Sequence, residues 1–463
     1  MFDIQYAIFA DKAVIEAQTG KVSLIGIFQV VTRALQVLPA LAFYCFAKAE
    51  AGKYELTLDI ESADDQGQKT SIARLPLEVQ VNAPGTAHFV LNINGLPIVG
   101  KELLFTVYRD QEKIHQEALC KAFDCGPLPK REGVLKRNHK LKQAVLLGKG
   151  KIASPEDVAV DQSGRIYTGS AINGKIYRLS GLVSESAPRA SLLSEKIEVF
   201  ANPGGLSLGL KFDADGNLIC CNAGMGLISV DKDGRITSLV SNVGGRKLYL
   251  VDDLDIASDG KIYFTEATTE RPGKSTDRAM VLDLLEEVPH GSLFVYDPKT
   301  KETKTLLSDL YFANGVAVSK DNSYVLVSET FRYRVRRYWL SGAKAGTSDV
   351  FADNLPGLPD GITTEVNDEY WVSLVFPRNA WMDFAERRPK LKELLVYLPR
   401  RLWAGYPHHG WVLKLDLNGR VIDDLEDPSG HVWSITNAVP WKDSLLLGSL
   451  RTKSVALYRL GSE

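Results

Sequence analysis

The sequence has few cysteines, and they are not arranged for a disulfide framework or a metal centre. The five are Cys45, Cys120, Cys125, Cys220 and Cys221. None is spaced with histidines as zinc ligands are. Cys220 and Cys221 are neighbours on a predicted strand, where their side chains point to opposite faces and a bridge between them is strained. This usage favours a reducing compartment.

Long apolar runs and a strong charge of either sign are also absent. The longest apolar run, residues 37–47, is about half the length of a membrane span. The first residues lack a basic region followed by an apolar run, so we expect a cytoplasmic protein. The formal net charge of −2 gives no general attraction to nucleic acid or to an anionic membrane.

The 463 residues are too many for one compact core, and the pattern changes along the chain. Residues 1–125 hold eight short apolar segments separated by turn signals, with no helical period, which predicts a small β-sandwich domain. The runs Phe9-Ala10-Asp11 and Gly20-Lys21-Val22-Ser23-Leu24 resemble an uncharacterised family of small bacterial β-domains. That resemblance implies no activity, and a docking role for this domain is the modest expectation.

A basic, proline-containing stretch, residues 126–142, has the composition of a linker. From residue 143 to residue 463 one pattern recurs six times: an apolar strand, a polar turn that often contains Asp-x-Gly, and a second apolar strand. A third and a fourth strand follow most copies. Four strands in each of six units predict a six-bladed β-propeller, so the fold class is all-β. The copies begin at residues 158, 210, 254, 316, 362 and 437. Residues 144–147 are expected to close the ring by pairing with the last blade.

An insertion at residues 379–407 interrupts the fifth repeat and has a helical pattern with one apolar and one basic side. Basic amphipathic helices can lie on membranes. A lid over one face of the propeller is the favoured interpretation, and contact with a membrane surface is the alternative.

The candidate cation ligands are residues that stand two positions before the start of each repeat. In order, that position holds Glu156, Leu208, Asp252, Asn314, Asp360 and Ile435. The innermost strands of a propeller surround its axis, so equivalent positions converge there. Oxygen donors without sulfur or imidazole suit a hard cation, and we predict that Glu156, Asp252, Asn314 and Asp360 bind Ca²⁺ or another divalent ion.

Two alternatives remain open for these residues. Asn314-Gly315 and Asp360-Gly361 are common turn dipeptides, so each residue taken alone is explained as a turn residue. Asp252 stands beside Asp253, so the register in that repeat could differ by one. Four donors in one register of a repeat nevertheless favour the cation site.

The segments around these donors resemble the senescence-marker/gluconolactonase superfamily, and within it the strictosidine synthase-like branch. They include Ser154-Pro155-Glu156-Asp157-Val158, Asp252-Asp253-Leu254, Ala313-Asn314-Gly315-Val316 and Leu358-Pro359-Asp360-Gly361. The resemblance covers residues 143–463 and implies a six-bladed propeller. In the metal-dependent lactonases of the superfamily the calcium ligands are equivalent to Glu156, Asp252, Asn314 and Asp360.

Two departures from these families narrow the chemistry. Strictosidine synthases use a glutamate shortly after the Trp-Val-Ser of the fifth blade. Here Trp371-Val372-Ser373 is followed by Leu374-Val375-Phe376, which argues against amine–aldehyde condensation. Sugar-lactone hydrolases have a substrate-binding arginine before the Asp252 position, where this chain has Tyr249-Leu250-Val251.

These observations predict a calcium-dependent hydrolase that is not a strictosidine synthase. Its small-molecule substrates are expected to be lactones or esters of some apolar character, with Asp360 or Asp253 as the general base on water. The alternative is a non-catalytic binding propeller with a structural metal and an N-terminal docking domain.

Overall fold

The computed structural model describes two compact units, one made of residues 1–124 and 381–397 and the other of residues 125–380 and 398–463. In the second unit the described residues are 126–181, 196–269, 289–364, 367–378, 380 and 407–461; in the first they are the strands between residues 2 and 121, together with residue 383. The predicted helical insertion, apart from residues 380, 383 and 407, therefore lies outside the described residues. Among the described helices, none has the length and apolar character that a membrane crossing requires.

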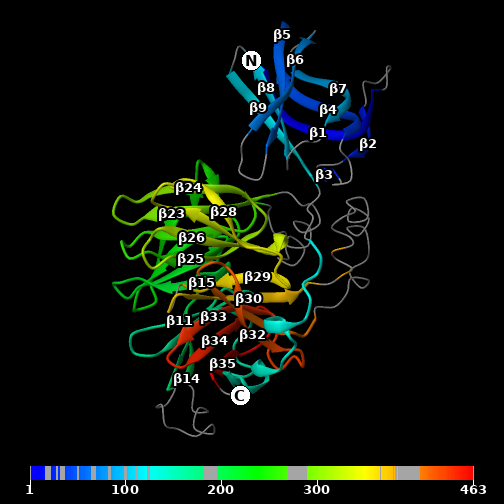
Figure 1. The fold of residues 1–463 in the computed structure, drawn as a ribbon. Coiled ribbons are helices and arrows are strands. Elements are labelled where there is room, and N and C mark those ends of the chain that lie inside the picture. Colours follow the sequence, from blue (N-terminus) through cyan, green and yellow to red (C-terminus); the bar gives the residue numbers. More distant parts are fainter. Residues whose placement is uncertain are drawn as a thin grey trace. The chain divides into compact units, whose positions relative to one another are not determined.

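The described part of the N-terminal unit consists of strands in two sheets, of order β2-β1-β4-β7 and β3-β9-β8-β5-β6 (Figure 1). In β5, Tyr54, Leu56, Leu58 and Ile60 are buried, whereas the residues between them are more exposed. This alternation gives the strand one apolar face. The arrangement of the two sheets as a sandwich stays a prediction. The strands are β1 (Phe2–Ile15), β2 (Val22–Ile27), β3 (Val30–Val31), β4 (Val37–Ala49), β5 (Gly52–Ala63), β6 (Lys69–Val81), β7 (Gly85–Pro97), β8 (Glu102–Arg109) and β9 (Glu112–Lys121).

The second unit is a six-bladed β-propeller of four-stranded antiparallel sheets, as predicted (Figure 1). Blade 1 holds β11 (Pro155–Val160), β12 (Ile166–Ser170), β13 (Ile176–Ser180) and β14 (Lys196–Ala201). Blade 2 holds β15 (Leu206–Phe212), β16 (Leu218–Ala223), β17 (Gly226–Val230) and β18 (Ile236–Val240). Blade 3 holds β21 (Val251–Ile256), β22 (Ile262–Glu266), β23 (Gly291–Asp297) and β24 (Glu302–Leu310).

Blade 4 holds β25 (Ala313–Val318), β26 (Tyr324–Glu329), β27 (Arg334–Trp339) and β28 (Ser348–Ala352). Blade 5 holds β29 (Gly357–Ile362), β30 (Glu369–Pro377), β31 (Gly410–Asp416) and β32 (Val421–Asp427). Blade 6 holds β33 (Ile435–Trp441), β34 (Ser444–Ser449), β35 (Val455–Arg459) and β10 (Val145–Leu147). A short hairpin, β19 (Asn242–Val243) with β20 (Arg246–Lys247), precedes blade 3, and the 3₁₀ turns are η1 (Gly133–Leu135), η2 (Lys140–Gln143) and η4 (Thr330–Arg332).

The ring closes where the sequence predicted. β10 pairs with β35, with Leu146 opposite Ala456, so the first strand of the propeller is the outermost strand of its last blade. Closure in this way joins the two ends of the propeller through backbone hydrogen bonds and leaves no gap between blades 1 and 6.

The Asp-x-x-Gly turns between strands form because aspartate can cap its own turn. In the turn after β11, Asp161 Oδ1 accepts the N–H groups of Ser163 and Arg165, each at 2.9 Å. Gly164 then takes a φ of 77°, which a residue with a Cβ adopts only at a cost. The same arrangement recurs at Asp213, Asp231 and Asp416.

Apolar layers between neighbouring blades form the core. Cys220 packs into the layer between blades 1 and 2, and Cys221 into the layer between blades 2 and 3. The two buried thiols therefore lie on opposite faces of β16, as predicted for adjacent strand residues.

The stretch that the sequence assigned to a linker is bound to blade 5. Lys140 Nζ lies 2.8 Å from Asp423 Oδ1, and Asn138 Nδ2 donates to the backbone oxygen of Asp424 at 3.0 Å. Asn138 Oδ1 also accepts the Glu426 N–H at 3.0 Å. Basic residues that suggested a solvated linker thus pair with the outer strand of a blade.

Candidate functional site

Each innermost strand begins with a β-bulge, and this bulge builds the site. The pairing of β11 with β12 skips from Pro155 to Val158, and equivalent shifts occur in all six blades. A bulge leaves residues unpaired and changes the direction of their side chains. Here the first residue of each bulge lines one cavity, and the polar second residues Asp157, Asp253 and Asn437 line another. The pairs are Glu156-Asp157, Leu208-Gly209, Asp252-Asp253, Asn314-Gly315, Asp360-Gly361 and Thr436-Asn437.

The four predicted ligands meet in one cavity of about 60 Å³. Glu156, Asp252, Asn314 and Asp360 all line it, which confirms that the repeat register brings them together. They come from blades 1, 3, 4 and 5. We call this space the ligand cavity.

The sixth position of the ring is Thr436, one residue later than the sequence indicated. Ile435 is the paired residue that precedes the bulge of β33, and it packs in an apolar cluster at 1% exposure. Thr436 lines the ligand cavity, and its hydroxyl donates to the backbone oxygen of Glu156. The prediction was wrong here because strand pairing resumes at Ala438, whereas the sixth repeat had been started at Asn437.

Three carboxyl groups share the ligand cavity with almost nothing to balance their charge. Glu156, Asp252 and Asp360 are 7%, 6% and 5% exposed. Burial, followed by repulsion from neighbouring carboxylates, holds the pKa values of Glu156 and Asp360 well above their usual range. Burial raises the pKa of Asp252 to about 7. No lysine, arginine or histidine is among the described residues that line the cavity.

This donor set fits a hard cation in its chemistry. Every polar side-chain donor in the cavity is an oxygen or an amide, and clustered carboxylates repel one another unless a cation or protons balance them. Among the described residues, however, no three Asp, Glu, His or Cys side chains already surround a common point as metal ligands do. The cavity thus brings suitable donors together without a finished coordination shell.

The rest of the ligand cavity is apolar. Ala171, Leu206, Leu208, Leu250, Phe312 and Leu450 complete its lining. Phe312 packs against Phe331, with the ring centroids 4.6 Å apart. The polar groups therefore share this small space with apolar walls.

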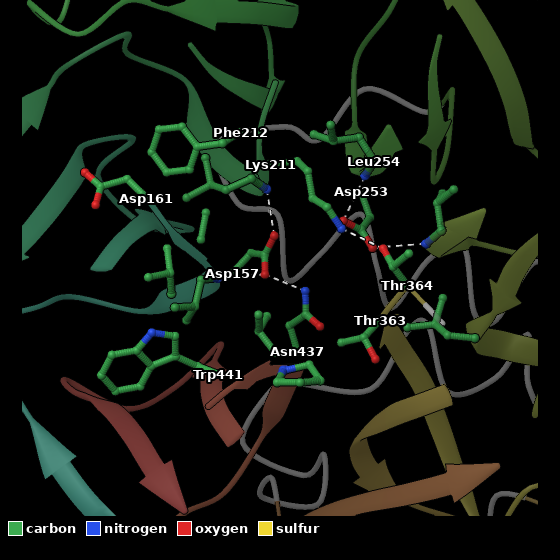
Figure 2. Close-up of a pocket in the computed structure, with 18 residues that line it drawn as sticks. Asp157, Asp161, Lys211, Phe212, Asp253, Leu254, Thr363, Thr364, Asn437 and Trp441 are labelled. Atoms are coloured by element: carbon green, nitrogen blue, oxygen red, sulfur yellow. Dashed lines mark hydrogen bonds between the residues drawn. The ribbon is translucent and has the colours of Figure 1, made fainter. Parts of the chain in front are cut away.

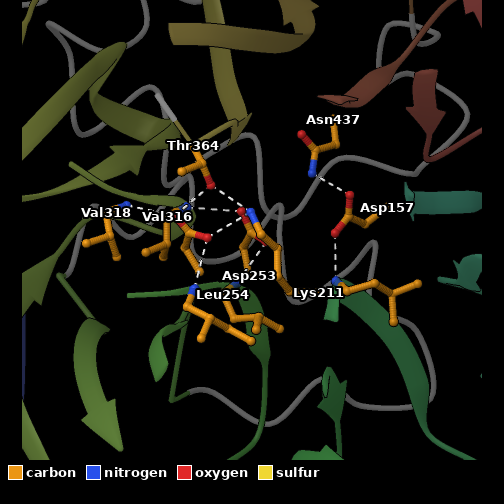
Figure 3. Close-up of polar contacts among 11 residues, drawn as sticks. Asp157, Lys211, Asp253, Leu254, Val316, Val318, Thr364 and Asn437 are labelled. Atoms are coloured by element: carbon orange, nitrogen blue, oxygen red, sulfur yellow. Dashed lines mark hydrogen bonds and ion pairs between the residues drawn. The ribbon is translucent and has the colours of Figure 1, made fainter. Parts of the chain in front are cut away.

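Asp253, the second candidate for the general base, lies elsewhere. It lines a different and larger cavity, where its Oδ1 accepts the Leu254 N–H at 2.8 Å and its Oδ2 accepts the Val316 N–H at 3.0 Å (Figures 2 and 3). Val316 belongs to blade 4, so Asp253 joins two blades. The structure therefore separates Asp253 from the four ligands and leaves Asp360 as the candidate base in the ligand cavity.

Sequence reasoning missed a second set of polar residues, one position after the ligands. Asp157 Oδ2 accepts the Leu210 N–H of blade 2 at 2.6 Å, and Asn437 of blade 6 donates to Asp157 Oδ1 (Figure 3). The signal was present in the repeats, because this position holds Asp157, Gly209, Asp253, Gly315, Gly361 and Asn437. Glycine is required beside the polar residues: a Cβ at Gly209 would stand 2.7 Å from the Asp253 Cα.

A Gly-x-Ser-x-Gly sequence also occurs, at Gly205-Leu206-Ser207-Leu208-Gly209, but it is not a nucleophile elbow. Such an elbow is a sharp turn between a strand and a helix that exposes the serine. Ser207 instead lies within β15, fully buried, and its hydroxyl donates to the backbone oxygen of Gly174 at 2.7 Å. Its geometry is that of a brace between blades 1 and 2.

The fold and the ligand cavity together define a class: a six-bladed propeller with a carboxylate-lined cavity at one end of its central channel. Residues 133–179 match the N-terminal region of the strictosidine synthase-like family, and residues 252–343 match the strictosidine synthase family. The adipocyte plasma membrane-associated protein of Bos taurus is 33% identical over 340 residues, covering 71% of this chain and 81% of that protein. Protein strictosidine synthase-like 3 of Arabidopsis thaliana is 31% identical over 360 residues, 73% of this chain and 90% of that protein. The chain belongs to the strictosidine synthase-like family, which confirms the resemblance seen in its motifs.

Solved structures with a similar fold include a gluconolactonase of Xanthomonas campestris, with a TM-score of 0.49 and 17% identity over 69% of this chain and 91% of that one. A calcium-binding regucalcin of Agrobacterium tumefaciens has a TM-score of 0.44 and 15% identity, covering 68% of this chain and 91% of that one. The resemblance of the N-terminal unit to bacterial β-domains stays a prediction.

Proposed function

We propose that this protein is a calcium-dependent hydrolase of lactones or esters, with the cation held by Glu156, Asp252, Asn314 and Asp360. The observation that carries the proposal is the ligand cavity, in which three nearly buried carboxyl groups and an amide converge with no positive group among the described residues that line it. Bare carboxylates in such a place repel one another, and a divalent cation removes that cost.

The roles of the residues follow from their surroundings. A bound divalent cation would polarise a carbonyl oxygen. Asp360 is the candidate to accept the proton of a water that attacks the carbonyl carbon, because its carboxylate lines the cavity in which the cation would lie. The bond from that carbon to the leaving oxygen then breaks, and the leaving oxygen takes up the proton. Leu250 and Phe312 would hold the apolar part of the substrate.

Two features of the chain argue against the reactions of two related groups of enzymes. Strand β30 continues from Ser373 into Leu374, Val375 and Phe376, so no carboxylate stands where strictosidine synthases have their glutamate. Ser373 donates its hydroxyl to the backbone oxygen of Thr436 at 2.5 Å and braces the strand beside it. Leu250 lines the ligand cavity beside the position where sugar-lactone hydrolases have an arginine. The first feature argues against amine–aldehyde condensation, and the second favours apolar lactones or esters over sugar lactones.

The test combines metal analysis with turnover of gamma-nonalactone and para-nitrophenyl butyrate. Wild type should retain a divalent ion after gel filtration and hydrolyse at least one substrate, whereas Asp360→Ala and Glu156→Ala should lose both properties. Asp233→Ala, in an exposed turn of blade 2, is the matched control and should behave as wild type. Absence of a bound divalent ion, together with equal turnover in all four proteins, would overturn the proposal.

A second candidate is a non-catalytic binding propeller with a structural metal and an N-terminal docking domain. The size of the ligand cavity favours it, because about 60 Å³ holds an ion and a few waters but not a lactone ring. EDTA distinguishes the two functions. In a binding protein it should lower the melting temperature without changing any esterase activity, whereas in a hydrolase it should abolish turnover.

A further inference from the structure

A second cavity, larger than the ligand cavity, lies at the other end of the channel. It has a volume of about 450 Å³, within the range of small-molecule sites. The first residues of the innermost strands line the ligand cavity, and later residues line this second cavity. In β11, for example, Glu156 lines the ligand cavity, and Val158 and Val160 line the second one. The two cavities share no lining residue, so we call the larger one the distal cavity.

The walls of the distal cavity are mainly apolar (Figure 2). They include Val160, Phe212, Leu254, Ile362, Val439 and Trp441. Two of these side chains, Phe212 and Trp441, are aromatic and come from different blades. Such walls favour a ligand whose surface is largely hydrocarbon.

A lysine borders this cavity and connects three blades. Lys211, of blade 2, places its Nζ 2.8 Å from Asp255 Oδ1 of blade 3 (Figure 3). The same nitrogen donates to Thr364 Oγ1, after β29 of blade 5, at 2.6 Å. Thr364 in turn donates to Asp255 Oδ2 at 2.7 Å. These contacts fix the side chain of Lys211 beside the cavity.

Lys211 remains a cation there, with donor capacity to spare. Burial alone would lower its pKa, but the charges of Asp255, Asp157 and Asp253 raise the pKa of Lys211 above its usual value. An ammonium has three N–H groups, and two have partners among the described residues. The side chain keeps 39% of its surface accessible, which leaves room for a third partner.

The carboxylates of the cavity, in contrast, already have a donor on each oxygen. Both oxygens of Asp157 and both of Asp253 accept hydrogen bonds. Asn437 gives one amide hydrogen to Asp157, while its Oδ1 accepts the Ala438 N–H at 2.8 Å. Its second amide hydrogen has no partner among the described residues. Lys211 and Asn437 therefore each offer an unused donor to the distal cavity.

We propose that the distal cavity binds an uncharged, mainly apolar molecule through a carbonyl oxygen, which accepts hydrogen bonds from Lys211 and Asn437. The charge of Lys211 is already balanced by Asp255 at 2.8 Å, so a carboxylate ligand would bring an unbalanced charge into a mainly apolar site, and a cation would be repelled by the Lys211 ammonium. A molecule without an acceptor would leave the third N–H of Lys211 unpaired in an apolar site. This site is independent of the proposed hydrolase function.

The test uses four probes of similar size on the full chain: acetophenone, benzoate, benzylamine and isopropylbenzene. Calorimetric titration should show saturable binding of acetophenone that is about tenfold tighter, or more, than binding of the other three. Lys211→Met should weaken acetophenone about tenfold or more, since it removes the charged donor. Val160→Phe should do the same by filling the cavity. Asp360→Ala, in the ligand cavity, should leave acetophenone binding unchanged.

Each other outcome would overturn the proposal. Equal binding of isopropylbenzene would show a merely apolar hole, and preference for benzoate or benzylamine would show that the charge argument is wrong. If acetophenone does not bind saturably, or if Val160→Phe binds it as tightly as wild type does, the distal cavity is not a binding site. If Lys211→Met fails to fold, Val160→Phe decides, because it keeps every polar contact of Lys211. Failure of this test leaves the hydrolase proposal intact, since that proposal depends on metal and turnover.

Discussion

Neighbouring carboxyl groups in the same bulge have opposite surroundings. In blade 3, Asp253 accepts backbone N–H groups from its own strand and from blade 4, whereas Asp252 has no hydrogen-bond donor among the described residues. In blade 1, Asp157 is bonded to blades 2 and 6, while the Glu156 carboxyl group has no such partner. One member of each pair is hydrogen-bonded to other blades and borders the distal cavity, and the other lines the ligand cavity without a hydrogen-bond partner among the described residues.

This difference separates structural from functional carboxylates by a physical criterion. A buried charge persists when hydrogen bonds or an opposite charge compensate it. Asp157 and Asp253 accept backbone N–H groups from neighbouring blades and so hold blades together, although burial still raises the pKa of Asp157 to about 6 and the pKa of Asp253 well above its usual range. Glu156 and Asp252 have no hydrogen-bond partner among the described residues, so they require protons or a cation from outside. The bulge makes both arrangements available from two consecutive residues.

The largest expected effect comes from truncating the two neighbours in blade 3. Asp253→Ala leaves the buried N–H groups of Leu254 and Val316 without acceptors, which should lower the free energy of unfolding by roughly 2–4 kcal/mol. Asp252→Ala should be neutral or stabilising in the metal-free protein, because it removes an unbalanced buried carboxyl group. Urea denaturation in EDTA measures both. If the two substitutions lowered the stability equally, Asp252 and Asp253 would not differ in their contribution to folding, contrary to this comparison.

Calcium should stabilise the protein only through the carboxylates that line the ligand cavity. At a hundredfold excess over its dissociation constant, a ligand of the folded state stabilises it by about 2.7 kcal/mol. We expect such a gain in wild type and its loss in Asp252→Asn and Asp360→Asn. Asp253→Asn should start from lower stability and still gain from calcium. Thermal melts with and without Ca²⁺ test this, and a calcium response that survives in Asp360→Asn would contradict the assignment of ligands.

Proton binding gives a third test, in the metal-free protein. Burial raises the pKa of Asp252 to about 7 in the folded state, above the value of about 3.9 for an unfolded chain. The folded state thus binds the proton more tightly, so this group's contribution to stability should decline as pH rises from about 4 to 7 and level off above. The slope is at most about 1.4 kcal/mol per pH unit. Denaturation in EDTA across this range should show a smaller decline in Asp252→Asn than in wild type. A steeper decline of stability in the variant than in wild type would contradict the expectation that the folded state binds this proton more tightly.

The sequence predicted the blades and the ligand cavity because both depend on a repeated register. Glu156, Asp252, Asn314 and Asp360 are equivalent positions, and ring symmetry alone brings such positions together. The sixth position could not be placed, because nothing in the run from Ile435 to Asn437 marks where the bulge of β33 begins. A local change in strand pairing moved that position by one residue.

Contacts that connect different blades were beyond the sequence pattern. Lys211 meets Thr364 across 153 residues of chain, and neither residue occupies the ligand register. The linker prediction missed contacts for the same reason, since Asn138 finds its partners in Asp424 and Glu426, nearly three hundred residues away. Pairing of this kind depends on the closed ring, which the composition of a segment does not encode.

The smallest expected effect concerns the contacts that fix Lys211 beside the distal cavity. Thr364→Val keeps the shape of the side chain but removes the hydroxyl that accepts from Lys211 and donates to Asp255. The Lys211–Asp255 ion pair remains, so the free energy of unfolding should fall by only about 1 kcal/mol. Because no charge changes, calcium stabilisation should equal that of wild type. Thr363→Val, whose hydroxyl contacts the backbone of Trp371 instead, is a matched control for loss of a neighbouring hydroxyl. Unfolding in urea with and without Ca²⁺ measures both quantities. A loss of calcium stabilisation in Thr364→Val alone would mean that the two ends of the channel are coupled, and that the carboxylates balanced inside the protein also support those that face the ligand cavity.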